Sequence, residues 1–424
     1  MDERGRAWVE PGRNGPSRFG HMVVAGLVAA GSFTATHPSG MVARWLVVRA
    51  PVVQRWQLVP PGSQGTGFTA SRVFPEHRGD WVIADQGAVW WVPRADRMGR
   101  RLWTLNVHSA ARTPSGIDWV VGSRGNRIVL ARLSPNGAVR MMPWPLPYVE
   151  WWKGRGIEGA STPGPATQVA WAGGHLWAMG VVRTARFGFY RPVIAMITPG
   201  GRAQDPWTVP LVGGAFTALT GGDHGGLWIG GNTGAWFGEN GSYRGNAELV
   251  ALNPVRHTVK AHVSAPSMGY DGSGPNEDTP DTVVVRGNTV WTGLVWFQEA
   301  QGGPDPHTLW SLNPISGAWT QHPLAPANNR VGFRATAWTA AAGGRIGAAV
   351  YIADAVAGVA AQRDPVWGEV FWDRHVVAVL HSGGVALGVN LLGGGRLAMT
   401  VAHEGPRGSI NSVQVIVVRV RRES

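Results

Sequence analysis

The stretch LARLSPNGAVRMMPWPLP at residues 130–147 recurs in outline three more times along this chain. The later copies are IAMITPGGRAQDPWTVPL at 194–211, LVALNPVRHTVKAHVSAP at 249–266 and LWSLNPISGAWTQHPLAP at 309–326. Each consists of an apolar strand, a turn built from polar residues and proline, and a second strand that runs toward proline. The turn prolines are spaced by 64, 55 and 60 residues; they are Pro135, Pro199, Pro254 and Pro314. A repeat with this period predicts a chain built from equivalent units.

A second shared pattern precedes three of these copies and adds two strands to each unit. It reads QVAWAGGHLWAMG at 168–180, ALTGGDHGGLWIGG at 218–231 and VVVRGNTVWTG at 283–293. Each copy is an apolar strand, a glycine-containing hairpin turn and a strand with tryptophan. The unit therefore has four antiparallel strands, which is typical of the blade of a β-propeller. A period near 60 in 424 residues predicts an all-β propeller of seven blades, and six or eight blades also fit.

The two ends of the chain indicate how this propeller is closed. Residues 1–19 are polar and rich in Gly, Pro and Arg, so we expect an extended arm, followed by a single propeller domain over 20–424. The run 413–420 near the C-terminus is too apolar to be exposed to solvent. We therefore expect it to pair with a strand near the N-terminus, because closure leaves no sheet edge open.

Composition narrows the classes of partner and chemistry. The net charge is +12, and only Lys153 and Lys260 among 38 basic residues are lysines, so an arginine-rich surface is expected to favour acidic partners such as anionic glycans. The arginine clusters lack interleaved aromatic residues, and specific nucleic-acid recognition is not predicted. The absence of cysteine excludes disulfides, thiolate metal sites and cysteine nucleophiles. Most of the 23 tryptophans are expected to pack between blades.

The N-terminal sequence suggests where the protein acts. MDERGRAWVE lacks the features of a signal peptide, and the apolar run MVVAGLVAAG at 22–31 is too short to span a bilayer. We therefore expect neither a signal peptide nor a membrane span. A virion or a leaderless route to the cell surface is favoured over the cytoplasm.

Several of the repeated motifs resemble a known family. GGDHGGLWIGG at 221–231, ITPGG at 197–201 and LSPNG at 133–137 are similar to repeats of streptogramin-lyase-like propellers and of sensor propellers in two-component regulators. The resemblance covers about residues 117–325 and implies a propeller fold. For the lyases it also implies a metal-dependent reaction in the central channel. The positions that match the family's glutamates read Ile229-Gly230, Ala178-Met179 and Thr292-Gly293, so the resemblance lies in the fold alone.

Candidate binding residues fall mainly in the variable loops. Trp152, Tyr190 and Tyr270 are predicted to contact a ligand or partner, because aromatic rings in loops suit stacking on sugars or anchoring a protein. The segment 270–281 gathers acidic residues, of which Asp271, Glu277 and Asp278 are candidate Ca²⁺ ligands. A solvated loop is the alternative interpretation of this segment.

The motifs of this sequence favour a binding protein over an enzyme. The sequence contains no phosphate-binding loop, no G-x-S-x-G and no H-E-x-x-H, and no cofactor is predicted beyond the Ca²⁺ candidate. We therefore predict a non-enzymatic structural or interaction module, virion-associated or at a cell surface, that binds a protein or an anionic glycan. The alternatives are a metal-dependent lyase or hydrolase acting in the channel and a ligand-sensing propeller. Partner identity and oligomeric state are not predicted.

Overall fold

The computed structural model consists of β-strands in the part of the chain that it describes. The described residues are 46–58, 71–75, 79–84, 88–93, 98–103, 106–124, 127–148, 167–184, 189–222, 225–237, 243–264, 277–286, 288–297, 309–322, 332–340, 346–353, 367–372, 375–380, 384–392, 395–404 and 410–420. These ranges hold strands β1 to β29 and no α-helix. Accordingly, none of them contains a helix able to cross a membrane. The all-β prediction is confirmed for the described residues.

The strands form antiparallel groups of four in chain order. The first groups are β3 (Ser71–Pro75), β4 (Gly79–Ala84), β5 (Ala88–Pro93) and β6 (Met98–Trp103), then β7 (Asn106–Arg112), β8 (Asp118–Arg124), β9 (Arg127–Leu133) and β10 (Val139–Pro143). Next come β11 (Gln168–Ala172), β12 (His175–Arg183), β13 (Tyr190–Ile197) and β14 (Ala203–Thr208), then β15 (Gly213–Gly221), β16 (Leu227–Phe237), β17 (Tyr243–Asn253) and β18 (Thr258–Ser264).

The remaining strands follow the same order, with two exceptions at the N-terminal side. The groups are β19 (Glu277–Arg286), β20 (Thr289–Phe297), β21 (Leu309–Leu312) and β22 (Trp319–His322), then β23 (Gly332–Ala340), β24 (Ile346–Ala353), β25 (Trp367–Trp372) and β26 (His375–Leu380). β1 (Leu46–Val48) adds to the edge of β26. The last group is β27 (Gly384–Leu392), β28 (Arg396–Glu404) and β29 (Ile410–Arg419), completed by β2 (Val52–Leu58).

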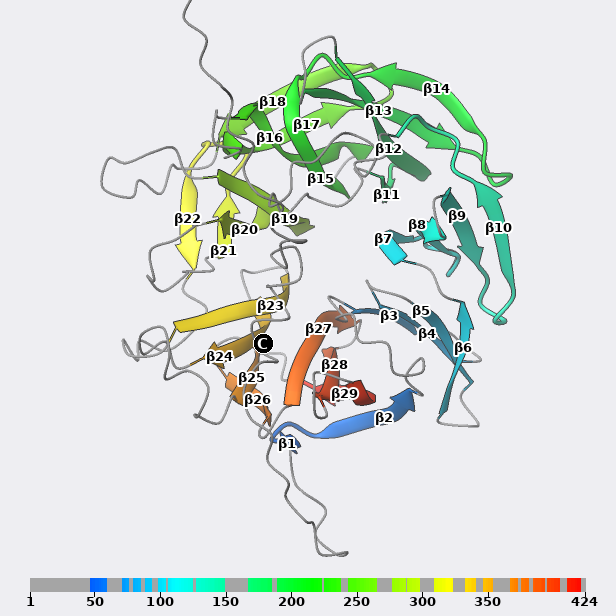
Figure 1. Cartoon of the computed structure of the whole chain (residues 1–424), viewed down its shortest axis with the longest axis vertical. Helices are drawn as coiled ribbons and strands as arrows, with labels where there is room; N and C mark the ends of the chain where they lie inside the picture. The colour runs from blue at the N-terminus through cyan, green and yellow to red at the C-terminus, as the bar shows by residue number, and fades with distance from the viewer. Residues whose placement is uncertain are drawn as a thin grey trace, which may run out of the picture.

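The groups stand in a ring around a central opening, with β7, β11, β15, β19 and β27 near the opening and β10, β14 and β22 at the outside (Figure 1). This is a β-propeller arrangement of four-stranded units. Three of these units, β11–β14, β15–β18 and β19–β22, match the full repeat seen in the sequence: the Gly turn joins the first two strands and the Pro turn joins the last two.

Hydrogen bonding among the described strands defines five sheets, which differs from the prediction of seven blades. Two of the sheets contain eight strands, because neighbouring groups of four meet there edge to edge. β13 and β15 are joined through the pair Tyr190↔Gly213. β2 and β6 are joined in parallel through Gln57↔Met98 and Leu58↔Gly99. These two short junctions merge groups that the repeat pattern treats as separate.

The C-terminal strand closes the ring. β29 pairs antiparallel with β28 on one side and with β2 on the other, in the register Leu58↔Val413 and Val52↔Val418. Residues Val415, Ile416, Val417 and Val418 are fully buried. The prediction that the run 413–420 pairs with a strand near the N-terminus is therefore confirmed.

The hydrophobic core lies between neighbouring groups of strands. One cluster joins Trp119 and Leu130 of β8 and β9 to Ile197 of β13. The next cluster joins Met179 of β12 to Leu252 of β17. Buried tryptophans supply much of this packing, namely Trp119, Trp144, Trp177, Trp228, Trp291, Trp310 and Trp372. Flat rings fill the space between sheets that splay apart, as expected from the composition.

Because β29 closes the ring, substitutions of its buried residues are expected to lower the stability of the fold strongly. Ile416→Ala is expected to lower the free energy of unfolding by about 2–5 kcal/mol, because it leaves a cavity beside β2 and β28. Val53→Ala in the partner strand β2 is the control: Val53 is 40% exposed, and its truncation should change stability by about 0.5 kcal/mol or less. Urea unfolding of both variants measures the difference. Equal effects would contradict the closing role of β29.

Candidate functional site

The candidate site lies on one face of the ring, which we call the turn face. In an antiparallel group of four strands, the turns after the first and third strands lie on the same side. The turn face is therefore made by the described turns at residues 113–117, 134–138, 173–174, 198–202, 225–226, 254–257 and 313–318. The Pro turns of the repeat all lie on this face.

A pocket of about 290 Å³ opens on the turn face between the β11–β14 and β15–β18 groups. Its described lining residues are Ala172, Gly173, His175, Trp177, Gly225, Gly226, Asn253, Val255, Arg256 and Lys260. Gly173 and Gly225 touch at the junction: a Cβ built on Gly173 would lie 3.0 Å from the Cα of Gly225, and both residues have positive φ. Only glycine fits such an approach of two turns.

The pocket is cationic. Arg256 in the β17–β18 turn and Lys260 in β18 are both exposed at its edge, together with His175 at the start of β12. None of its described lining residues is acidic. Lys260 reaches this position through an irregularity of register, because Leu252 pairs with Val259 whereas Ala251 pairs with Ala261. Such a bulge re-aims a side chain that a regular strand would place elsewhere.

Trp177 forms the apolar side of the cationic pocket. Its ring is buried, and its Nε1 donates a hydrogen bond of 3.2 Å to the carbonyl oxygen of Ala172. The imidazole of His175 lies edge-on to this ring, with 6.4 Å between the ring centroids. The pocket thus combines a buried aromatic wall with exposed cationic side chains, an arrangement that suits one acidic group of a larger partner.

The turn beside the pocket is held by His257. Its Nε2 lies 3.0 Å from Oδ2 of Asp205, and its ring stacks on Trp207 of β14 at a centroid distance of 5.3 Å. Both His257 and Asp205 have positive φ, 53° and 49°. In the other Pro turns the residue with positive φ is a glycine, with φ of 69° to 84° at Gly137, Gly201 and Gly317.

The presence of histidine instead of glycine indicates that the side chain of His257 has a structural role in the β17–β18 turn. A non-glycine residue in the left-handed region costs roughly 1–2 kcal/mol. Contacts to the neighbouring group offset that cost, so His257 ties the β17–β18 turn, and Arg256 within it, to β14. Strain of this kind gathers at functional positions.

His257→Gly is expected to change the free energy of unfolding by about 1 kcal/mol or less, because relief of the strained φ offsets the lost contacts. His257→Val should be destabilising by about 1–2 kcal/mol, since a β-branched residue is strained at positive φ and makes neither contact. Chemical denaturation of the two variants gives both values. A glycine variant as unstable as the valine variant would show that backbone strain at His257 is unimportant.

A second set of polar contacts joins two neighbouring innermost strands, β7 and β11. Nδ1 of His108 lies 2.6 Å from the hydroxyl of Thr167, just before β11, and the hydroxyl of Ser109 bonds to the backbone of Val169. His108 is the extra residue where the β7–β8 register shifts. Burial lowers the pKa of His108 to about 4, so its ring is neutral at neutral pH. Burial also lowers the pKa of His322, which bonds to Ser311 at 2.7 Å.

Acid is expected to destabilise the fold through His108. Its pKa is 6.5 in the unfolded chain and about 4 in the folded one, so the unfolded chain binds more protons between these values. The stabilising contribution is complete above pH 6.5 and falls by up to about 1.4 kcal/mol per pH unit as the pH decreases toward 4. Urea unfolding at pH 7, 6 and 5 should show a flatter pH dependence for His108→Asn than for the wild type. Identical slopes would contradict this assignment.

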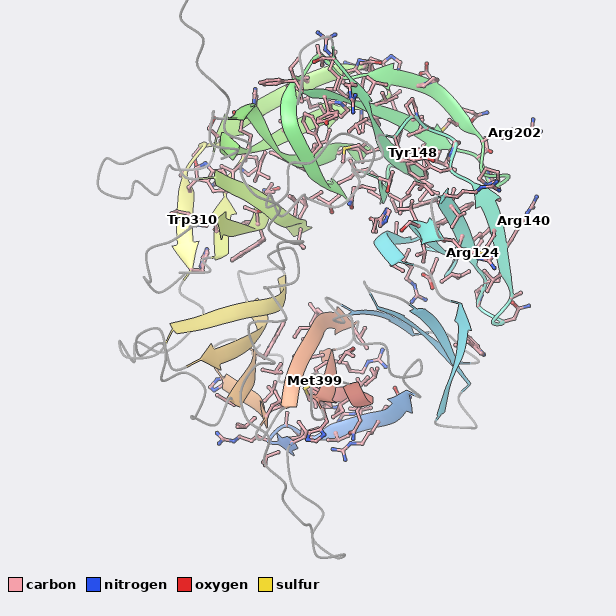
Figure 2. The ribbon with its side chains drawn as sticks, viewed as in Figure 1. Arg124, Arg140, Tyr148, Arg202, Trp310 and Met399 are labelled. Atoms are coloured by element: carbon pink, nitrogen blue, oxygen red, sulfur yellow. The ribbon has the colours of Figure 1, made fainter. Side chains whose placement is uncertain are left out.

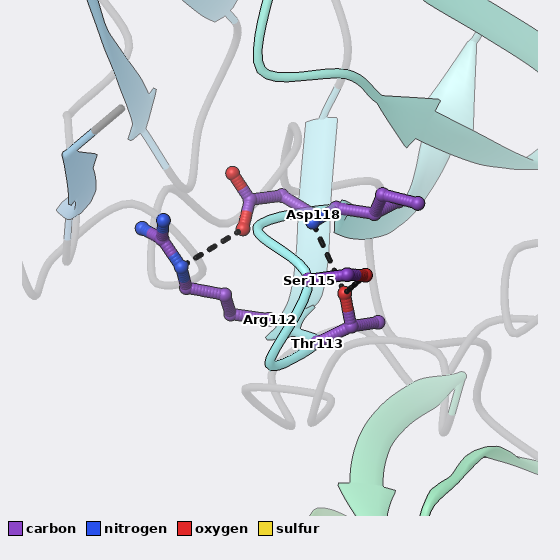
Figure 3. Close-up of polar contacts among 5 residues, drawn as sticks. Arg112, Thr113, Ser115 and Asp118 are labelled. Atoms are coloured by element: carbon purple, nitrogen blue, oxygen red, sulfur yellow. Dashed lines mark hydrogen bonds and ion pairs between the residues drawn. The ribbon is translucent and has the colours of Figure 1, made fainter. Parts of the chain in front are cut away.

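The buried acidic side chains of the described residues contact basic or hydroxyl side chains nearby. Asp118 is fully buried, and its Oδ1 lies 3.9 Å from Nε of Arg112 across the β7–β8 turn (Figure 3). The hydroxyl of Thr113 completes this turn by accepting a hydrogen bond of 3.0 Å from the backbone N–H of Ile117. Glu248 likewise contacts Nε2 of His262 and accepts a hydrogen bond from Ser264. These carboxylates stabilise turns and strand pairs.

The predicted contact residues are not brought together in the described chain. Tyr190, expected in an exposed loop, is the first residue of β13 and is 5% exposed in the core. Burial raises the pKa of its hydroxyl, and the adjacent Arg183 partly opposes this effect. Trp152 and Tyr270 lie outside the described residues, and their contact role stays a prediction.

The predicted calcium ligands are only partly described. Glu277 and Asp278 lie at the start of β19, whereas Asp271 falls outside the described residues. Within the ranges given above, no group of three or more His, Asp or Glu is arranged to hold a metal ion. His257 and His262, close in sequence, have different carboxylate partners, Asp205 and Glu248.

The sequence interpretation missed the cationic pocket, although signals for it exist. His257 is three residues after Pro254, and the β21–β22 turn has Gly317 at that position. Lys260 is one of two lysines in a chain rich in arginine. Its approach to Trp177 and Gly173 depends on contacts between separate groups of strands, which no local pattern shows.

Comparison with known proteins finds similar solved structures but no matching family. No family model and no curated protein matches it. Similar solved structures include BamB from Moraxella catarrhalis, with 11% identity, coverage of 83% of this chain and 99% of that one, and a TM-score of 0.42. The polysaccharide lyase Uly1 has 8% identity, coverage of 88% and 100%, and a TM-score of 0.46. YCF48 bound to D1 peptide has 8% identity, coverage of 91% and 100%, and a TM-score of 0.43.

These similarities bear on neither activity nor partner. No family match supports the streptogramin-lyase-like type, so that resemblance stays at the level of the propeller fold. The strand topology itself establishes the fold, and the candidate function follows from the turn face.

Proposed function

We propose that this protein is a non-enzymatic interaction module that binds an acidic partner at the cationic pocket. The observation that carries the proposal is the convergence of Arg256, Lys260 and His175 around one opening whose described lining contains no carboxylate. Positive charge gathered in a concave site raises the local concentration of anionic groups and speeds their association.

The geometry supports binding of a group that belongs to a larger molecule. A volume of about 290 Å³ is at the lower limit of small-molecule sites, so it suits one acidic side chain or one acidic sugar. Exposed cations contribute modestly, about 0.2–1 kcal/mol for each ion pair, and salt screens them. The partner is therefore expected to use further contacts on the turn face.

Exposed arginines outside the pocket add to the positive charge of the protein. Arg202, in the β13–β14 turn, is exposed, and so is Arg140 in β10. Figure 2 shows both side chains at the outer edge of the ring. Such exposed arginines add to the positive potential of the protein, which favours association with acidic molecules.

We also propose a blade count for the propeller. We interpret each group of four strands as one blade, which gives seven blades once the junctions at Tyr190↔Gly213 and at β2 with β6 are treated as contacts between blades. A place in a virion or at a cell surface stays a prediction.

A charge-matched pair of variants tests the function. Arg256→Ala with Lys260→Ala is expected to weaken binding of a fluorescent octaglutamate peptide by about two- to thirtyfold, the range allowed by two exposed ion pairs. Arg124→Ala with Arg127→Ala removes the same charge from exposed residues at the β8–β9 turn, on the opposite face, and should change binding less than twofold. Fluorescence anisotropy at two salt concentrations measures both.

The Arg124/Arg127 variant separates binding at the pocket from general attraction to a positively charged protein. Equal weakening by both double variants would mean that peptide binding reflects only the net charge of +12. No weakening by the pocket variant would reject the proposed function. Melting curves recorded by circular dichroism establish that each variant is folded.

A further inference from the structure

We infer that the acidic partner is a protein segment that also carries aliphatic side chains and that it crosses the β17–β18 and β21–β22 turns. This inference rests on the proposed function and specifies its partner. It selects a protein over an anionic glycan, the other class of partner compatible with a basic surface.

Two aliphatic side chains project from the turn face. Val255 is 71% exposed and Ile315 is 83% exposed, whereas the other exposed large apolar residues of the described chain reach only 38% to 46%. Both occupy the same position of the repeat, directly after the turn proline. The matching positions of the β9–β10 and β13–β14 turns hold Asn136 and Gly200. The aliphatic pair is thus confined to two neighbouring turns.

The turns present these side chains rigidly. Oδ1 of Asn313 accepts hydrogen bonds from the backbone N–H groups of Ile315 at 3.0 Å and Ser316 at 3.3 Å. Asn253 accepts one from Arg256 at 3.1 Å. Proline before each aliphatic residue further restricts the backbone. A partner that buries Val255 and Ile315 therefore orders little of this protein, which favours binding.

Charge gives the two turns different roles. Val255 lines the cationic pocket beside Arg256 and Lys260. The turn that carries Ile315 reads Asn-Pro-Ile-Ser-Gly and has no charged residue. An acidic side chain fits the first turn and an aliphatic side chain fits the second. An anionic glycan satisfies the pocket but offers Ile315 no apolar side chain to bury against.

Two peptides of equal charge test this inference. The probes are a twelve-residue peptide of alternating Glu and Leu and one of alternating Glu and Ser, with binding measured by fluorescence anisotropy. The wild type should bind the Leu peptide about tenfold more tightly, as expected for burial of aliphatic surface. Val255→Ser with Ile315→Ser should abolish that advantage, so that this variant binds the two peptides about equally.

Val212→Ser is the matched control. Val212 is 38% exposed and lies between β14 and β15, in a connection after a fourth strand and so on the face opposite the turn face. This variant should keep the full preference for the Leu peptide, because the segment does not reach that face.

The outcomes separate the inference from the proposed function. If the Leu preference persists in the Val255/Ile315 variant, the aliphatic footprint is wrong, while loss of Ser-peptide binding in the Arg256/Lys260 variant still supports the acidic site. If neither peptide responds to the Arg256/Lys260 variant, the proposed function itself is wrong. Tighter binding of a sulfated oligosaccharide of equal charge than of either peptide would overturn the choice of a protein partner.

Discussion

The pairing of β29 with β2 is the constraint on which the rest of the structure depends. A ring of sheets buries both faces of each group only while every group has two neighbours, and this strand pair joins the last group to the start of the described chain. Its residues Val415–Val418 are fully buried. Closure therefore protects apolar faces and sheet edges together. Closure also keeps neighbouring groups in contact. The cationic pocket lies where two such groups, β11–β14 and β15–β18, meet.

The repeated turns form a common framework on which individual residues carry function. Three Pro turns follow the expected backbone chemistry, with glycine at the position of positive φ. The β17–β18 turn departs from this rule through His257, and the following strand departs from regular register at Lys260. Both departures lie beside the pocket. Proteins tend to break local rules where a site requires it and to compensate by contacts elsewhere, as Asp205 and Trp207 do here.

Much of the fold could be predicted because its signals are local. The four-strand unit follows from the spacing of Gly and Pro turns, and the closing strand follows from an apolar run with no other means of burial. The sheet count could not be predicted, because one pair at Tyr190↔Gly213 is enough to merge two groups. Tyr190 was expected in a loop, but an extended β13 carries it into the core, where it packs with residues from two groups.

The sequence by itself determined the class of architecture, the repeated turns and the basic character of the surface, because each depends on composition or on neighbours in the chain. Only the tertiary structure decided which cations converge. Arg256 and Lys260 come from one group of strands, whereas Gly173, His175 and Trp177 come from the preceding one. Their meeting depends on the packing of one sheet against the next, and that packing involves residues roughly 80 positions apart that no periodic pattern connects.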